Sequence, residues 1–324
     1  MQTQTLNCDP LLSDFEMPLQ SVYHPLGFSV EVTTNSPDIL AAAEESWGQF
    51  RKVFSVPPLQ IRIGVLDPGP AECSAIPVWR AQRGLLARVA DSENFSVSDV
   101  KHGFSFAWLT RSTVDDRAYL RWNFIEPMCW DLLEPYLTPV HAACVRLGER
   151  GVLLCGDSGA GKSSLSFACA LKGWTYLTDD GTCLVRGCQD RVVVGNPYKI
   201  RFRESALELF PELKKHPPTP RASGEMAIEL PTASLPEIRT ATESPVDYIV
   251  FLKRGGDGSA RLLPFPKDTA LEWFERVICY GVKENVDVHK ASLRRLLGAE
   301  IFELRYGDLD SAVARLEAMV RNGT

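Results

Sequence analysis

The sequence predicts an α/β fold in two parts, a smaller α+β domain over residues 1–125 and a larger α/β domain over residues 126–324. The length of 324 residues allows roughly two domains of the usual size. Residues before 125 show short alternating strands around one helix, whereas residues 138–210 change to strand, loop, helix and strand. This change of pattern places the domain boundary near residue 125.

Alternating apolar and polar residues predict the strands of the N-terminal domain. These strands are expected over residues 28–33, 59–65, 85–89, 104–109 and 118–122. One helix is expected over residues 41–50, because the Asn-Ser-Pro-Asp stretch at 35–38 is a helix start signal. Residues 1–20 are polar with scattered prolines and are expected to form a loose arm.

The C-terminal domain is expected to begin with a helix over residues 128–136 and to continue as strands alternating with helices. Strands are expected over residues 152–155, 174–178 and 246–253, and helices over residues 164–172, 269–281, 289–297 and 309–321. Residues 214–245 contain six prolines among polar residues. We therefore expect a long Pro-rich loop there, a kind of segment that is often functional or mobile.

Composition limits the classes of partner. The formal net charge is −6 and the pI about 5.5, so we expect no nucleic-acid binding, which requires clustered Lys and Arg. The N-terminus has no leader pattern, and no run approaches the roughly 20 apolar residues of a membrane span, so we expect no membrane insertion. Nine cysteines without a C-x-x-C pair fit a reducing compartment, and we expect a cytoplasmic protein. Self-association, as a homo-oligomer, is left open.

The segment with the clearest chemistry lies between an apolar strand and a helix. Residues 156–163 read Gly-Asp-Ser-Gly-Ala-Gly-Lys-Ser, the G-x-x-x-x-G-K-S pattern of a phosphate-binding loop. Glycines let the backbone N–H groups curl around phosphate oxygens, and the helix start adds a positive dipole end. The predicted nucleotide-binding residues are Gly156, Asp157, Ser158, Gly159, Ala160, Gly161, Lys162, Ser163 and Ser164. The alternative is a glycine-rich turn of purely structural use.

Two carboxylates follow the strand expected over residues 174–178. Asp179 and Asp180 would then lie at the carboxyl end of that strand, where ligands bind in open α/β sheets. Mg²⁺ prefers oxygen ligands and usually binds through one or two carboxylates, so the pair fits a metal–nucleotide site. A surface turn is the alternative. His141 precedes the strand that feeds the loop, and a single His beside apolar residues is more often structural than functional.

Together these residues resemble the kinase domain of HPr kinase/phosphorylase, whose fold is related to phosphoenolpyruvate carboxykinase. The resemblance rests on His141, the loop at 156–163, Lys172-Gly173 and the Asp179–Asp180 pair. It covers residues 138–185 and extends weakly to the C-terminal helices. Residues before 125 do not look like the regulatory domain of that family. The resemblance implies a P-loop kinase domain of the HPr kinase/phosphoenolpyruvate carboxykinase type in the C-terminal part.

The resemblance also implies a role for each residue that matches the family pattern. Lys162 and the loop amides hold the triphosphate, and Ser163 and Asp180 help to hold Mg²⁺. Asp179 is the general base for the attacking hydroxyl, and His141 lies close to the reacting phosphate. The implied catalytic residues are therefore Asp179, His141 and Lys162.

One segment departs from the family pattern. The Glu-Arg-Gly signature that helps to bind metal and acceptor is not evident, and Lys199, Arg201 and Arg203 alternate in its place. On a strand these side chains would share one face. Facing the phosphates, they would bind phosphate or acceptor and neutralise developing charge. Facing water, they would form an ordinary basic edge.

These expectations describe a kinase that depends on ATP and Mg²⁺ and transfers the γ-phosphoryl group to a hydroxyl. The acceptor would be a serine of a protein or peptide, or a small molecule. GTP in place of ATP is left open, because no base-reading motif is present. The alternative is a non-catalytic ATP-binding sensor, which would not need a base at Asp179. Carboxykinase-like chemistry ranks below both, because no second metal cluster or dicarboxylate clamp is evident.

Overall fold

The computed structural model describes residues 15–66, 75–188, 190–220, 225–255, 259–277 and 283–323. The chain divides into two compact units, Met1–Pro135 and Tyr136–Thr324. The boundary expected after residue 125 falls inside a helical run, because η2 (Arg121–Ile125) continues directly into α4 (Glu126–Leu133). Across the described residues, no helix is both long and apolar enough to cross a bilayer.

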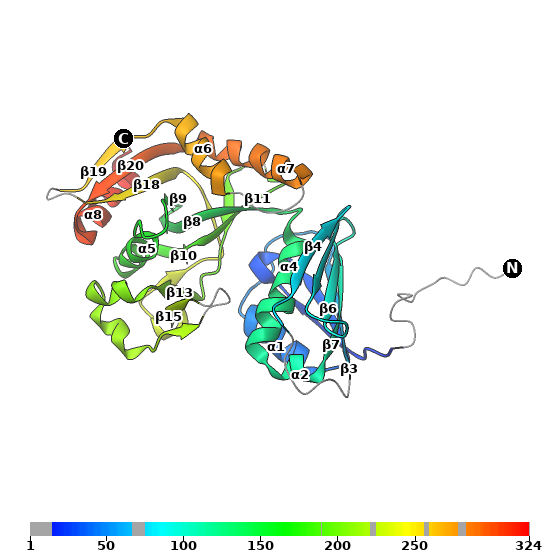
Figure 1. Ribbon diagram of the computed structural model, residues 1–324. Helices are drawn as coiled ribbons and strands as arrows, with labels where there is room; N and C mark the ends of the chain where they lie inside the picture. Colours follow the sequence, from blue (N-terminus) through cyan, green and yellow to red (C-terminus); the bar gives the residue numbers. More distant parts are fainter. Residues whose placement is uncertain are drawn as a thin grey trace. The chain divides into compact units, whose positions relative to one another are not determined.

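The first unit is built on a seven-stranded sheet with helices packed against it (Figure 1). The strand order is β1 (Leu19–Tyr23), β2 (Val30–Thr34), β3 (Leu59–Leu66), β7 (Phe104–Thr110), β6 (Phe95–Asp99), β5 (Leu85–Val89) and β4 (Val78–Gln82). The strands β2, β3 and β7 run parallel, and the other neighbours run antiparallel. The helical segments are η1 (Pro25–Gly27), α1 (Pro37–Trp47), α2 (Arg111–Asp115), α3 (Arg117–Leu120), η2 and α4. Most of the expected strands are present, and β1, which begins at residue 19, shortens the expected arm.

The strand expected over residues 118–122 is wrong, because this segment is helical. Asp116 caps α3 by accepting a hydrogen bond from the backbone N–H of Tyr119 at 3.0 Å. Leu120, Phe124 and Met128, which follow at a spacing of four residues, are all fully buried. The apolar residues of this segment therefore follow the helical period, and not the alternation that was expected for a strand.

A buried ion pair joins α4 to the sheet of the first unit. Both terminal guanidinium nitrogens of Arg88 on β5 donate to the carboxylate of Asp131, one of them at 2.7 Å. Ser98 on β6 donates to the same carboxylate at 2.8 Å, and Ser105 on β7 donates to Ser98 at 2.7 Å. A bidentate Arg–carboxylate pair with a further donor satisfies the charges that burial would otherwise leave unpaired.

The second unit is built on a ten-stranded sheet. Its main path runs β17 (Glu243–Pro245), β12 (Val192–Val194), β11 (Gly181–Val185), β8 (Leu137–Leu147), β9 (Arg150–Cys155), β18 (Tyr248–Arg254), β20 (Glu300–Tyr306) and β19 (Arg261–Pro264). Off this path, β10 (Thr175–Thr178) pairs with β8 and with β16 (Arg239–Thr240). Because β9, β18 and β20 run parallel, their carboxyl ends meet at one edge of the sheet.

Helices cover both faces of this sheet (Figure 1). One face packs against α5 (Lys162–Leu171) and α8 (Leu309–Asn322), through apolar residues that include Leu154, Val250 and Leu304. The other face packs against α6 (Lys267–Val277), α7 (Lys283–Leu293) and η6 (Arg294–Gly298). Strands buried on both faces read as near-continuous apolar runs, which is why Val-Leu-Leu-Cys in β9 lacks alternation.

The long loop expected over residues 214–245 is replaced by short strands and turns over 214–220 and 225–245, and residues 221–224 lie outside the described part of the chain. A three-stranded sheet contains β13 (Lys199–Phe202), β15 (Met226–Pro231) and β14 (Thr219–Pro220), with η3 (Glu204–Glu208), η4 (Pro211–Lys215) and η5 (Thr232–Ser234) around it. The prolines do not prevent pairing, because Pro220, Pro231 and Pro245 each lie at the end of a strand. Ile228 and Leu230 of β15 are buried in an aromatic core with Phe167.

Candidate active site

Residues 156–163, which we call the glycine loop, join β9 to α5 at the carboxyl edge of the second sheet. Gly156, Gly159 and Gly161 have φ angles of 151°, 87° and 98°, values that other residues rarely adopt. A Cβ at Gly161 would lie 2.5 Å from the hydroxyl of Tyr306, and one at Gly156 would lie 2.7 Å from the Cβ of Ala160. The loop therefore requires glycine at both positions, for conformation and for space.

Lys162 begins α5 and turns its side chain back under the loop. Its Nζ donates to the backbone carbonyl of Gly156 at 2.9 Å and lies 3.0 Å from Nε2 of His141. It also lies 3.7 Å from Oδ1 of Asp180. Only 6% of Lys162 is exposed, and burial lowers the pKa of the ammonium group, while the Asp180 charge raises it.

His141 on β8 connects Lys162 to Asp180. Its Nδ1 lies 3.2 Å from Oδ1 of Asp180, and its Nε2 faces Lys162, which carries only donors. This arrangement assigns the neutral tautomer with the proton on Nδ1, donating to Asp180 and accepting from Lys162. Burial lowers the pKa of His141, and the Lys162 charge lowers it further against the opposing effect of Asp180. The neutral imidazole is therefore the form that this network stabilises.

Strand pairing explains why these three residues meet. β11 pairs antiparallel with β8, and its first residue, Gly181, is opposite His141. Asp180 precedes Gly181 directly, so the pairing carries its carboxylate to the imidazole. On the other side, β8 pairs with β9, which leads into the glycine loop and Lys162.

Asp179 differs from its neighbour Asp180 in environment. It is 8% exposed, whereas the Asp180 side chain is 44% exposed. Desolvation raises the pKa of Asp179 to about 6, in spite of a hydrogen bond at 2.8 Å that Oδ2 accepts from the backbone N–H of Arg201. The two adjacent carboxylates are therefore suited to different tasks, one with a raised proton affinity and one accessible to a ligand.

The expected cluster of Lys199, Arg201 and Arg203 is only partly present. Lys199 and Arg201 share one face of β13 and bind Glu229 of β15, with N–O distances of 3.4 Å and 2.9 Å. Arg203 lies beyond the end of the strand and donates to the hydroxyl of Ser158 in the glycine loop at 2.8 Å. Arg203 is therefore the member of this set that reaches the loop.

The remaining predicted residues line the loop and the first turn of α5. Asp157 and Ser158 are exposed, whereas Ala160, Ser163 and Ser164 are half-buried. No side chain caps the start of α5 within the described part of the chain. The first N–H groups of an α-helix have no partner within the helix, so those of α5 are available to a ligand at the loop.

Three contacts of the glycine loop come from residues that the sequence did not single out. Trp273 Nε1 and Arg276 Nη2 on α6 donate to Oδ1 of Asp157, at 3.3 Å and 2.9 Å. The hydroxyl of Tyr306 donates to the carbonyl of Ala160 at 3.2 Å. Each lies more than 100 positions along the chain from the loop, so no local pattern could reveal the contact. The alternation of polar and apolar residues over 303–306 was the missed signal that would have placed Tyr306 at a strand end.

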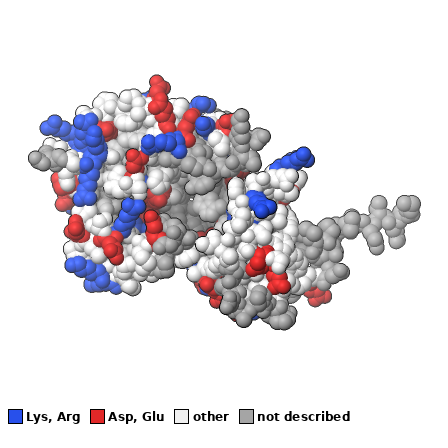
Figure 2. Space-filling model, in the orientation of Figure 1, with Lys and Arg blue, Asp and Glu red and all other residues white. Residues whose placement is uncertain are grey.

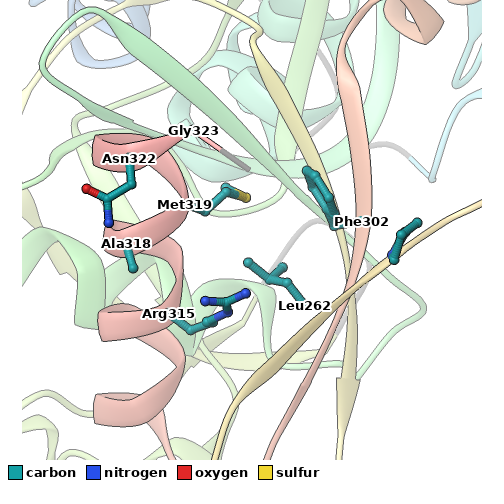
Figure 3. A pocket seen from close by; sticks show the side chains of 8 residues that line it. Leu262, Phe302, Arg315, Ala318, Met319, Asn322 and Gly323 are labelled. Atoms are coloured by element: carbon teal, nitrogen blue, oxygen red, sulfur yellow. The ribbon is translucent and has the colours of Figure 1, made fainter.

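A hollow lies between β19, β20 and the end of α8 (Figure 3). Its volume is about 350 Å³, and it is lined by Leu262, Pro264, Phe302, Arg315, Ala318, Met319, Asn322 and Gly323. Phe302 lies near the start of β20, whereas Tyr306 at the other end of that strand contacts the glycine loop. This lining contains no carboxylate, so it offers no acid–base pair.

No protein-family model and no curated protein matches the chain in sequence. Among solved structures, the HPr(Ser) kinase/phosphatase from Coxiella burnetii aligns with a TM-score of 0.32 and 13% identity. The alignment covers 57% of this chain and 93% of that one. This is at most a distant structural relationship to an HPr kinase, and it does not define an activity for this chain. The fold itself is mixed α/β with several sheets.

Proposed function

We propose that the second unit is a kinase that uses ATP and Mg²⁺ and transfers the γ-phosphoryl group to a hydroxyl. One observation supports this most strongly. Asp179 is a buried carboxylate whose pKa is about 6. Its neighbour in sequence, Asp180, contacts Lys162 and His141 beneath the glycine loop. A proton acceptor and a phosphate-binding cation beside one loop are the groups that phosphoryl transfer needs.

Each end of the transfer has a candidate group. The oxygen of the acceptor hydroxyl attacks the γ-phosphorus, and the bond between this phosphorus and the β–γ bridging oxygen breaks. Asp179 takes the hydroxyl proton as the new P–O bond forms, and ADP leaves with the electron pair of the broken bond. Lys162 and the loop amides offset the negative charge that gathers on the phosphate oxygens. Asp179 is suited to this role because a base with a pKa near the working pH transfers protons most effectively.

Mg²⁺ would be held by Ser163 and Asp180 together with the nucleotide. A hydroxyl and a carboxylate are the hard oxygen donors that this ion prefers, and few protein ligands suffice when phosphates supply the rest. The contacts of Asp180 with His141 and Lys162 both use Oδ1, and the side chain is 44% exposed, so its carboxylate is accessible to a ligand. The ion supplies charge neutralisation of the phosphates when it is bound.

His141 orients the groups around it in this account. Its neutral ring accepts from Lys162 and donates to Asp180, which holds both side chains below the loop. Arg203, which donates to Ser158, provides a further cation at the loop on the side of β13. The acceptor itself is a hydroxyl of a protein, a peptide or a small molecule, and GTP remains an alternative donor.

The second candidate function is a non-catalytic ATP-binding sensor. Trp273 and Arg276 favour it, because they tie α6 to Asp157 and would respond to a ligand in the loop. The buried Asp179 disfavours it, because a sensor gains nothing from a desolvated carboxylate that lowers stability at neutral pH.

Label transfer separates these candidates. Purified protein is incubated with γ-labelled ATP, Mg²⁺ and host lysate divided into macromolecular and small-molecule fractions, with Lys162→Ala as the control. We expect label that depends on Lys162 to enter a protein, a peptide or a metabolite. If ATP binds but no label moves in any fraction, the kinase account is overturned in favour of the sensor.

A further inference from the structure

Three cations lie side by side where β18, β20 and β19 meet at the edge of the second sheet. Lys253 of β18 is paired in register with Arg305 of β20, and Arg305 is paired with Arg261 of β19. We call Lys253, Arg305 and Arg261 the basic row. In Figure 2, blue atoms gather over this end of the unit, at the left of the view.

Alternation along the strands fixes the face on which the basic row lies. Leu252, Leu304 and Leu262, each next in sequence to a member of the row, are also paired in register and pack into the core with α8. The row therefore projects from the opposite face, because successive side chains of a strand point to opposite sides. On that face Phe251 packs against Trp273 of α6, with ring centroids 5.3 Å apart.

The basic row is unfavourable for the free protein. Like charges directly opposite each other on neighbouring strands are destabilising. Arg305 binds Glu303, but no carboxylate among the described residues forms an ion pair with Lys253 or Arg261. All three members are exposed, and the chain as a whole carries a net charge of −6. An anionic partner would remove this repulsion, whereas the fold gains nothing from it.

The basic row begins beside the glycine loop. A Cβ at Gly156 would lie 3.5 Å from the carbonyl oxygen of Leu252, the residue before Lys253. The catalytic groups approach the loop from the other side, since β8 with His141 and β18 with Lys253 flank β9 on opposite edges. From Lys253 the row extends outward to β19, the last strand of the sheet, across roughly 10 Å at the usual strand spacing.

We propose that the basic row is the docking surface for an acidic segment of a protein or peptide acceptor. This inference rests on the proposed function, because it assigns the acceptor to the polypeptide class. Charge complementarity selects an anion, and the outward direction of the row selects an extended one rather than the nucleotide. In the proposed function the triphosphate is bound by Lys162 and the loop amides. Arg261 is too far from the loop to add to that site, because β18 and β20 lie between its strand, β19, and β9, which leads into the loop.

Binding of a defined acidic probe tests this proposal. Fluorescence anisotropy measures the affinity of a fluorescein-labelled oligoglutamate peptide for the full chain, in the presence of the nonhydrolysable ATP analogue AMP-PNP and Mg²⁺. The test variant is Lys253→Ala/Arg261→Ala/Arg305→Ala. The matched control is Lys52→Ala/Lys214→Ala/Lys215→Ala, which removes the same charge from exposed cations elsewhere. A labelled ATP analogue measures nucleotide affinity for each protein, and thermal unfolding checks that each one folds.

We expect the triple variant of the row to bind the probe at least about tenfold more weakly, and the control variant to bind as the wild type does. The affinity of the wild type should fall as salt rises from about 50 to about 300 mM, because exposed charges are screened. Nucleotide affinity should be unchanged in both variants. Equal probe binding by the row variant and the control would overturn the proposal, as would a loss of nucleotide affinity without a loss of probe binding. Failure of phosphoryl transfer would refute the proposed function separately, since this binding assay does not require turnover.

Discussion

The two sides of the glycine loop differ in how their charges are held. On the β8 side, His141, Lys162 and Asp180 form a closed set of contacts, and Asp179 is buried next to it. On the β18 side, cations stand exposed in a row with one carboxylate partner. Buried, mutually oriented groups fix proton positions and are suited to chemistry. Exposed, unpaired charges set on-rate and specificity and are suited to recognition. Changes on the first side should therefore alter turnover, and changes on the second side should alter binding.

The largest expected effect comes from removing the proposed base. Asp179→Asn keeps an oxygen that can accept the N–H of Arg201, but it cannot take a proton from the acceptor. We expect transfer of label to fall by about 10²–10⁴-fold, because general-base catalysis contributes that much. Nucleotide affinity, measured by titration calorimetry, should remain within about twofold of the wild type. A variant that keeps most of its transfer rate would show that Asp179 is not the base.

The raised pKa of Asp179 should make both the transfer rate and the stability of the protein depend on pH. Because only the carboxylate form accepts a proton, the rate of label transfer should rise with pH through about 6 and then level off. The stability effect has the opposite sign. The folded pKa is raised above the unfolded value of 3.8, so the unfolded state loses its proton first and stability falls as pH rises from about 4 to 6.

Asp179→Asn removes this penalty. The free energy of unfolding of this variant should therefore increase relative to that of the wild type as the pH rises from 4 to 7. The increase should reach about 3 kcal/mol, because each unit by which the folded pKa exceeds the unfolded pKa corresponds to about 1.36 kcal/mol. Urea unfolding at several pH values measures the difference. A difference that does not change with pH would contradict a raised pKa at Asp179.

A smaller effect on the transfer rate is expected from substitutions of His141, and it tests whether the neutral ring acts by orienting Lys162 and Asp180. His141→Gln supplies one amide oxygen for Lys162 and one N–H for Asp180, as the neutral ring does. His141→Ala supplies neither and leaves buried Lys162 without that partner. We expect transfer within about threefold of the wild type for the Gln variant and about tenfold lower for the Ala variant. Equal losses in the two variants would indicate that the imidazole acts by proton transfer, not by orientation.

The sequence predicted the part of the site that is local in the chain. The strand, glycine loop and helix from 152 to 172 follow one another directly, and each has its own signal in the residues. Asp179 and Asp180 were placed correctly at the end of a strand, because the β10 pattern is also local. Which carboxylate is buried was not predictable, since it depends on Arg201 and the sheet around β13.

Errors arose where the partner lies far away in sequence. The segment 214–245 was expected to be a loop because its strands are short and end in proline, and their pairing with β13 is set by tertiary contacts. Lys199 and Arg201 share one face of β13 as expected, but their ion pairs with Glu229 were not foreseen. Strand pairing places this carboxylate opposite Arg201 in register, which no local pattern could indicate.

Calorimetric titration of Mg-ATP into the wild type, Lys162→Ala and Asp179→Asn tests the central claim most directly. We predict that the wild type and Asp179→Asn bind with similar affinity and that Lys162→Ala binds at least about tenfold more weakly, because of these two side chains only Lys162 is proposed to contact the triphosphate. Equal binding by all three proteins, or no binding by the wild type, would contradict the assignment of the glycine loop as the nucleotide site.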